Sequence, residues 1–243
     1  SSCLFGQTGP ERAAAGVGTL GAAYSGASLM VGWPDRNPTG PYNAWTDSVT
    51  PRFIVASLLA AIRQRTLTGQ GCDIDVAQAE AGLQFLLPAY YEYAVNGRIP
   101  GRVGTDVDPL RAPSGSFPCA GADRWIVIDA SADAHWKALR ACAAPALDDP
   151  AFDTLVGRLR RRTQLHETLG AWTRKQDPHA LQDALQAAGV PAHVVSTCDE
   201  LSVDADLIAD GYYSEVVDPV IGRFQLRNAQ VRIAPSGTLA ARP

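Results

Sequence analysis

The 243-residue sequence contains no apolar run close to the ~20 uninterrupted residues that a membrane-spanning helix needs. Its formal net charge of -4 is small, so the overall charge favours neither a nucleic acid nor an anionic membrane surface as a partner. Internal repeats and low-complexity tracts are also lacking. With 46% hydrophobic residues the chain can bury one sizeable core or two modest ones, and a small molecule is the expected partner.

Cysteine and histidine are sparse and scattered. The five cysteines form no CxxC pair, which favours reduced thiols in a cytoplasmic protein over a disulfide framework or a zinc site. The four histidines show no metal-ligand spacing, so no metal site is predicted. His135 is the first of them, and residues 1–134 contain none. The opening letters "SSCLFGQTGPE" show neither an initiator Met nor a signal-peptide pattern, and we interpret them as the interior of a larger fold.

The first hundred residues alternate between glycine-rich and helical segments. Residues 12–31 are rich in Ala and Gly, which predicts either a tightly buried helix or a glycine-rich binding loop. Residues 32–43 carry three prolines and must form a loop. The apolar residues that follow recur at helical spacing up to Gly69, and Thr50 and Pro51 resemble the cap and first residue of that helix.

Another helix is expected to follow, because Asp75 and Gln78 have the spacing of a capping box. Pro88 should kink this helix and Gly97 should end it. Residues 98–117 are punctuated by Pro and Gly, and we interpret them as a linker at a domain boundary.

The remaining sequence is typical of a compact α/β unit followed by a hairpin. The elements that we expect are strands over 124–130 and 190–195, helices over 131–143, 159–176 and 177–189, and a hairpin over 212–233. Ser131 is the expected cap of the first of these helices, and Asp177, Pro178 and Gly189 supply the cap, first residue and terminator of the third.

Asp47 is a carboxylate in a polar turn just ahead of a long apolar helix. Near a helix N-terminus the dipole favours a charged carboxylate, as a nucleophile requires. If Thr50 caps the helix, Asp47 is not needed as a cap. On spacing alone, a capping or turn role for Asp47 is still the favoured interpretation.

The segment "TDSVTPRFIVASLLAAIRQRTLTGQGCDIDVAQAEA" (residues 46–81) resembles the signature region of the family III CoA-transferases, the CaiB/BaiF family. The segments "FGQTGP", "GWPDRNPTGPY", "AAGVPAHVV" and "DGYYSEVVDPVIGRF" also resemble family segments and occur in the family's order. The resemblance implies an α/β fold with a large, Rossmann-like domain and a smaller α/β domain. It also implies a chain that lacks the N-terminal Rossmann-like half.

This resemblance implies an enzyme that moves coenzyme A from an acyl-CoA thioester to a free carboxylate acceptor. The aspartate at the position of Asp47 is the family's nucleophile, and it forms an aspartyl anhydride and then an aspartyl-CoA thioester. Coenzyme A would be part of the substrates and not a permanently bound cofactor. The sequence does not identify the donor, the acceptor or the pathway.

Four further residues are candidates for substrate binding, each with a plain structural alternative. Gln78 could hydrogen-bond an acyl intermediate or serve only in a capping box. Arg52 could face a CoA phosphate or solvent. Trp45 and Tyr42 could line an acyl pocket or only pack. The arginine run 158–162 could attract an anion, but we interpret it as a solvated helix face.

The resemblance also implies a domain arrangement and an assembly. Residues 1–100 would belong to the large domain, 101–200 to the small domain, and 201–243 to a segment that returns to the large domain. The family forms interlocked homodimers, so we expect a homodimer. If an N-terminal half is missing, the helices within 12–31 and after Asp47 should expose apolar faces that it would cover.

Two rival functions remain open. An acyl-CoA racemase of the same superfamily would need a His and Asp acid/base pair in the large domain, and the lack of histidine before His135 counts against it. The other alternative is a catalytically inactive fragment with a role only in assembly.

Overall fold

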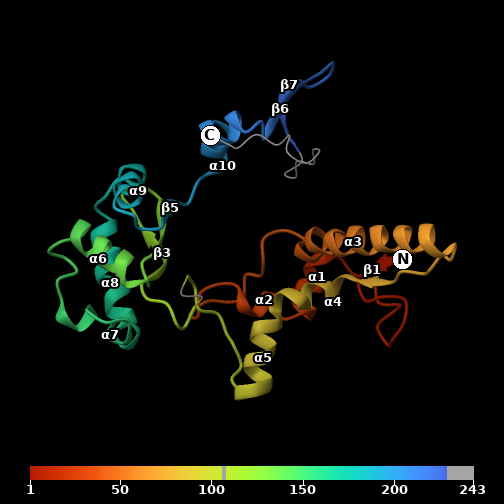
Figure 1. Ribbon diagram of the computed structural model, residues 1–243, viewed down its shortest axis with the longest axis horizontal. Helices are drawn as coiled ribbons and strands as arrows, with labels where there is room; N and C mark the ends of the chain where they lie inside the picture. Colours follow the sequence, from red (N-terminus) through yellow and green to blue (C-terminus); the bar gives the residue numbers. More distant parts are fainter. Residues whose placement is uncertain (106–107, 229–243) are drawn as a thin grey trace. The chain divides into compact units, whose positions relative to one another are not determined.

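The computed structural model describes residues 1–105 and 108–228 (Figure 1). It contains two compact units, Ser1–Gly115 and a second that begins at Ser116. Both units combine helices with short strands, so the predicted α/β class is confirmed. The three-part domain division at residues 100 and 200 stays a prediction.

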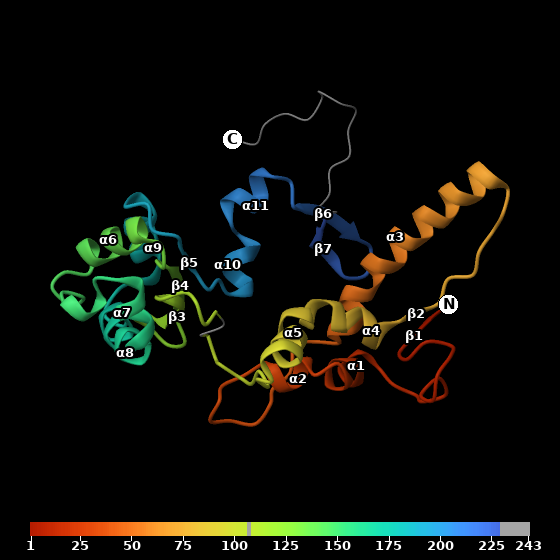
Figure 2. The same cartoon turned by 60° about the horizontal axis from the view of Figure 1, so that its bottom comes forward.

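The first unit is mainly helical. Its elements are β1 (Ser2–Cys3), α1 (Gly18–Tyr24), α2 (Ala27–Met30), α3 (Trp45–Thr68), β2 (Val76–Ala77), α4 (Gln78–Leu83), the 3₁₀ turn η1 (Gln84–Leu86) and α5 (Leu87–Asn96). Strands β1 and β2 pair in parallel, with Ser2 opposite Val76. Figure 2 shows α1 and α4 beside the first turns of α3, while the second half of α3 extends away from them.

The two predicted glycine terminators of this unit are confirmed. Gly69 ends α3 and Gly97 ends α5, both in the left-handed conformation that a glycine adopts without strain. The helix expected to kink at Pro88 is interrupted at η1, just before that proline. Residues 12–31 form two short helices, α1 and α2, preceded by a loop. The predicted loop over 32–43 is confirmed.

The first unit is packed mainly through small residues. Its buried side chains include Leu4, Ala22, Ser25, Ala27, Thr46, Thr50, Ala77, Ala79, Ala81 and Ala112. Of the 24 residues of α3, all of them described, only Thr46 and Thr50 are buried. Both α1 and α3 expose apolar side chains, as the sequence leads us to expect: Leu20, Tyr24, Phe53, Val55, Leu58, Leu59, Ile62 and Leu67.

The second unit is built around a three-stranded sheet of order β3-β4-β5. Its elements are β3 (Ser114–Pro118), β4 (Trp125–Asp129), α6 (Asp133–Cys142), the 3₁₀ turn η2 (Pro150–Phe152), α7 (Leu155–Arg160), α8 (Arg162–Thr173), α9 (Pro178–Ala187), β5 (Ala192–Val194), α10 (Cys198–Ser202), α11 (Ala205–Ala209), β6 (Tyr213–Asp218) and β7 (Gly222–Arg227). Strands β4 and β5 are antiparallel, with Val127 opposite His193. Its core, unlike that of the first unit, consists of large apolar residues: Phe117, Ile126, Ile128, Leu139, Leu147, Phe152, Leu165, Leu169 and Leu185.

Two predictions for this unit need correction. Strand β3 lies partly within residues 98–117, which we interpreted as a linker. Ser131 does not cap α6, because Ala132 is the residue before the helix and no side chain caps it. The Ser131 hydroxyl instead donates to the Asp129 carboxylate at 2.7 Å.

The predicted hairpin is confirmed as β6 and β7, which pair from Tyr213 opposite Arg227 to Asp218 opposite Gly222. Residues 229–233, which we also assigned to it, lie outside the described residues. Across 1–105 and 108–228, no helix is both long and apolar enough to cross a membrane.

The interpretation of the arginine run as a solvated face is wrong for Arg158, whose side chain is fully buried. Its guanidinium donates to the carbonyls of Phe152 at 3.2 Å and Ser131 at 3.0 Å, and lies 3.5 Å from the Asp133 carboxylate. It also lies over the Trp136 ring, 4.8 Å from the centroid. Burial lowers the pKa of Arg158, and Asp133 opposes that effect. Arg158 is therefore part of the core.

Candidate active site

The long helix α3 begins at Trp45, and no side chain caps its first N–H groups. The prediction that Thr50 caps the helix and Pro51 starts it is therefore wrong, since both residues lie inside it. Pro51 has no N–H to donate to the Asp47 carbonyl four residues earlier. The Thr50 hydroxyl donates to the Thr46 carbonyl at 2.6 Å and adds a bond to this part of the helix.

Asp47 is the third residue of α3, so its carboxylate lies in the first turn, where the helix dipole favours negative charge. The side chain is exposed. The carboxylate also lies against α1: a Cβ built on Gly18 would be only 2.8 Å from Asp47 Cγ. A carboxylate that rests on main chain and is open to solvent is accessible to an incoming electrophile.

Thr46, the residue before Asp47, is fully buried. Its hydroxyl donates to the Gly18 carbonyl of α1 at 3.0 Å. A Cβ on Gly21 would be 2.5 Å from Thr46 Oγ1, and one on Gly82 would be 3.0 Å from Thr46 Cγ2. The glycines of α1 and α4 thus let both helices approach the first turn of α3 closely.

The predicted wall residues and cation have the following surroundings in the structure, and their role in substrate binding stays a prediction. Trp45 packs edge-to-face on Phe85, with ring centroids 5.9 Å apart. Tyr42 lies ahead of the helix and is 97% exposed. Arg52 donates to the Ser48 carbonyl of its own helix. Arg52 is five positions after Asp47 in the helix, which places it about 140° around the helix axis from the carboxylate.

The capping box predicted for Asp75 and Gln78 is wrong. The Asp75 carboxylate accepts a hydrogen bond from the backbone N–H of Gln7 at 2.7 Å. Ala77 precedes α4, and no side chain caps that helix. Gln78 is therefore the half-buried first residue of a helix that packs against α3, and the capping role proposed as its structural alternative is excluded.

Sequence reasoning missed Gly18 and Thr46. The glycine-rich composition of residues 12–31 indicates a close approach of backbone to a neighbour. It does not indicate that the neighbour is the first turn of α3, because that contact joins segments 28 residues apart.

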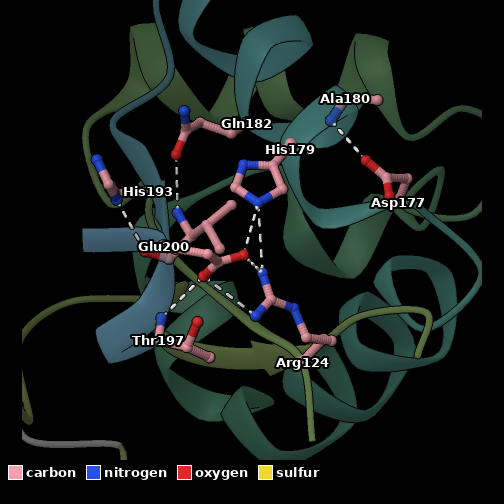
Figure 3. Close-up of polar contacts among 9 residues, drawn as sticks. Arg124, Asp177, His179, Ala180, Gln182, His193, Thr197 and Glu200 are labelled. Atoms are coloured by element: carbon pink, nitrogen blue, oxygen red, sulfur yellow. Dashed lines mark hydrogen bonds and ion pairs between the residues drawn. The ribbon is translucent and has the colours of Figure 1, made fainter. Parts of the chain in front are cut away.

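A second polar cluster lies in the second unit (Figure 3). Arg124, ahead of β4, donates to both oxygens of Glu200, at 2.5 and 3.2 Å. His179 Nε2, from α9, lies 3.0 Å from Glu200 Oε1. The backbone N–H of Thr197 donates to Glu200 Oε2 at 2.8 Å, as in a capping box. The spacing of Thr197 and Glu200 in the sequence is the signal that could have predicted this bond.

The charge of Glu200 is fixed by these contacts. The hydrogen bond from Arg124 above all, with those from Thr197 and His179, holds the pKa of Glu200 well below its ordinary value. The same bond raises the pKa of Arg124. A carboxylate so firmly ionised cannot act as a general acid near neutral pH, and we interpret the cluster as structural. Within the described residues, no group of three or more His, Cys, Asp or Glu side chains could hold a metal ion.

Comparison with known proteins identifies the fold and then the family. A solved structure of a CaiB/BaiF family protein from Brucella suis matches 96% of this chain and 60% of its own, with a TM-score of 0.83 and 24% identity. The fold is therefore that of the CaiB/BaiF proteins. The sequence profile of CoA-transferase family III matches residues 2–243, and the chain belongs to this family.

Curated relatives carry more specific names. The chain is 34% identical over 232 residues to succinyl-CoA–D-citramalate CoA-transferase of Chloroflexus aurantiacus, covering 95% of this chain and 57% of the relative. It is 30% identical over 182 residues to succinyl-CoA:mesaconate CoA-transferase of Haloarcula marismortui, covering 74% of this chain and 45% of the relative. The chain thus spans about half the length of these curated relatives.

Proposed function

We propose that this chain carries the nucleophile of a CoA-transferase, and that Asp47 is that nucleophile. The observation that carries the proposal is the position of Asp47, exposed in the first turn of α3 and resting on Gly18. Membership of CoA-transferase family III supports the reaction class. A carboxylate nucleophile can divide the exchange of a thioester for a carboxylate into easier steps.

The first half of the proposed reaction transfers CoA to the enzyme. An Asp47 carboxylate oxygen attacks the thioester carbonyl carbon of the donor, the carbon–sulfur bond breaks, and CoA leaves as the thiolate. The product is a mixed anhydride between Asp47 and the acyl group. The thiolate then attacks the Asp47 carbonyl carbon, which releases the donor as a free carboxylate and leaves an aspartyl-CoA thioester.

The second half runs the same steps in reverse with the acceptor. The acceptor carboxylate attacks the Asp47 carbonyl carbon and expels the CoA thiolate, which gives a new mixed anhydride. The thiolate attacks the acyl carbon of the acceptor and restores the Asp47 carboxylate. Each step exchanges one acyl bond for another, so CoA is a substrate component throughout and no permanent cofactor is required.

For the donor we propose succinyl-CoA, and for the acceptor a small dicarboxylate. Both curated relatives described above are named for succinyl-CoA, and their other named substrates, citramalate and mesaconate, are dicarboxylates. The interlocked homodimer and the cytoplasmic location stay predictions.

The test uses the protein expressed from its complete reading frame, incubated with succinyl-CoA and hydroxylamine. Hydroxylamine captures an aspartyl anhydride or thioester as a hydroxamate, and peptide mass spectrometry should find it on the peptide "AWTDSVTPR", which contains Asp47. Asp47→Asn nearly preserves the shape of the side chain but removes the nucleophile, so it should abolish both turnover and the adduct. Asp35→Asn, which changes an exposed carboxylate in the loop before α3, is the matched control and should retain both.

Four results would contradict the proposal. An adduct on another residue would identify a different nucleophile. Turnover that persists in Asp47→Asn would exclude covalent chemistry on Asp47. Racemisation of a chiral acyl-CoA without CoA exchange would favour the racemase alternative, and a protein with neither activity would have only an assembly role.

A further inference from the structure

The first turn of α3 is attached to α1 by the residue that precedes the proposed nucleophile. The fully buried Thr46 donates from its hydroxyl to the Gly18 carbonyl at 3.0 Å. Because Thr46 and Asp47 are adjacent in one helical turn, this bond also fixes the backbone from which the Asp47 side chain extends.

Gly18 also influences the position of Asp47, because only a residue without a side chain leaves room for the Asp47 carboxylate. A Cβ at this position would lie 2.8 Å from Asp47 Cγ, 2.9 Å from Asp47 Oδ1 and 2.8 Å from Ala44 Cβ. The φ angle of Gly18 lies outside the left-handed region, so its backbone conformation would accept alanine. The nearest atoms that exclude a side chain there belong to Ala44 and Asp47, at the start of α3.

We propose that Thr46 and Gly18 are positioning residues for the Asp47 carboxylate. This inference rests on the proposed function of Asp47. Thr46 holds the first turn of α3 at a fixed distance from α1, and the bare main chain of Gly18 provides the surface on which the carboxylate lies. Neither residue is required to touch the substrate.

Such positioning matters twice in the proposed reaction. Asp47 first presents an oxygen to the donor carbonyl carbon, and its own carbonyl carbon later receives the CoA thiolate. Both attacks depend on the orientation of one carboxyl group, and a displacement of about 1 Å can lower a rate by about 100-fold. Substrate contacts elsewhere would be unaffected, so the loss should appear in kcat and not in KM.

The test compares Thr46→Val, Thr46→Ser and Gly18→Ala in the protein from the complete reading frame. Valine keeps the shape of threonine but cannot donate a hydrogen bond. The kcat per trappable site, which is kcat divided by the fraction of sites that hydroxylamine can trap, should fall by about 10- to 100-fold, and KM should change by less than about 2-fold. Serine keeps the hydroxyl and should restore kcat to within about 3-fold of the parent. Gly18→Ala should lower kcat at least about 10-fold because its Cβ displaces the carboxylate.

Two variants serve as matched controls. Thr50→Val removes a hydroxyl from the other buried threonine of α3, which donates only within its own helix. Gly71→Ala adds a methyl where no atom lies within 4 Å. Both should keep kcat within about 3-fold of the parent, since neither changes the contact between α1 and Asp47. A fall in Thr50→Val equal to that in Thr46→Val would overturn the proposal.

A second measurement separates this inference from the proposed function. A water-soluble carbodiimide and an amine modify exposed carboxylates without any need for turnover. The ratio of the modification rate of Asp47 to that of Asp35 reports on the position and orientation of the Asp47 carboxylate. Thr46→Val and Gly18→Ala should change this ratio by at least about 3-fold, and Thr46→Ser should not. An unchanged ratio, or an unchanged kcat per trappable site, would overturn the positioning role. Activity in Asp47→Asn would instead refute the proposed function.

Discussion

The buried guanidinium of Arg158 provides a quantitative test of the second unit's core. Arg158→Ala would remove two hydrogen bonds to main-chain carbonyls and the contact with the Trp136 ring. Hydrogen bonds from a charged group contribute roughly 1.5–3 kcal/mol each and the ring contact about 1 kcal/mol, and they are not additive. Asp133 is 79% exposed, so water can solvate it after the change. We therefore expect the free energy of unfolding to fall by about 3–5 kcal/mol. Most of this fall comes from the two buried carbonyls that lose their hydrogen-bond donor and from the cavity that the side chain leaves.

Urea unfolding followed by tryptophan fluorescence measures this loss, and a thermal scan should show a fall in Tm of roughly 10 °C. Arg160→Ala is the matched control, because Arg160 belongs to the same arginine run but is exposed. Arg160→Ala should lower the free energy of unfolding by at most about 0.5 kcal/mol. If the two variants unfold at the same urea concentration, the burial of Arg158 does not stabilise the protein and the reasoning is refuted.

Two further predictions concern the second unit. Because Arg124 lowers the pKa of Glu200 in the folded state, the ionised carboxylate stabilises the fold above its unfolded pKa of about 4.3, and this contribution is lost as pH falls through the folded value. Glu200→Gln should therefore have a lower Tm than the parent at pH 7 and a smaller deficit at pH 3; an equal deficit at both would refute the linkage. The Asp177 carboxylate accepts a hydrogen bond from the Ala180 N–H at 2.9 Å and so caps α9. Asp177→Ala should therefore lower the free energy of unfolding in urea by about 1 kcal/mol, whereas Asp177→Asn should retain most of the stability of the parent. Equal losses in the two variants would exclude a capping role.

The sequence predicts those elements whose ends are specified by neighbouring residues. The cap Asp177, the first residue Pro178 and the terminator Gly189 all lie within or beside α9, and the structure has all three as predicted. The β6–β7 hairpin is likewise confirmed, since its strands and turn are adjacent in the chain.

Predictions fail where a distant segment decides the local structure. Thr50 and Pro51 have the pattern of a helix start, but the helix begins six residues before Pro51, where Thr46 is buried against α1 and α4. Asp75 has the spacing of a cap, but its carboxylate bonds to the Gln7 N–H, 68 residues away. Local patterns contain no information about such partners.

Part of the candidate site could be predicted from the sequence and part could not. Asp47 was identified through the resemblance of residues 46–81 to a family signature, and no periodicity or spacing alone would have favoured it over a capping residue. Gly18 and Thr46 carry no chemical pattern, since small buried residues are common in any fold. Their relation to Asp47 depends on the packing of α1 against α3.

The two units should also differ in the substitutions that they accept. In the second unit, large residues such as Leu139 and Ile126 fill the core, so reduction in size is the costly change there. In the first unit the helices meet at Gly18, Gly21 and Gly82, where an added Cβ would approach its neighbours to 2.8, 2.5 and 3.0 Å. Increase in size is the costly change at these positions. A saturation mutagenesis library should thus tolerate few residues other than glycine at these three sites.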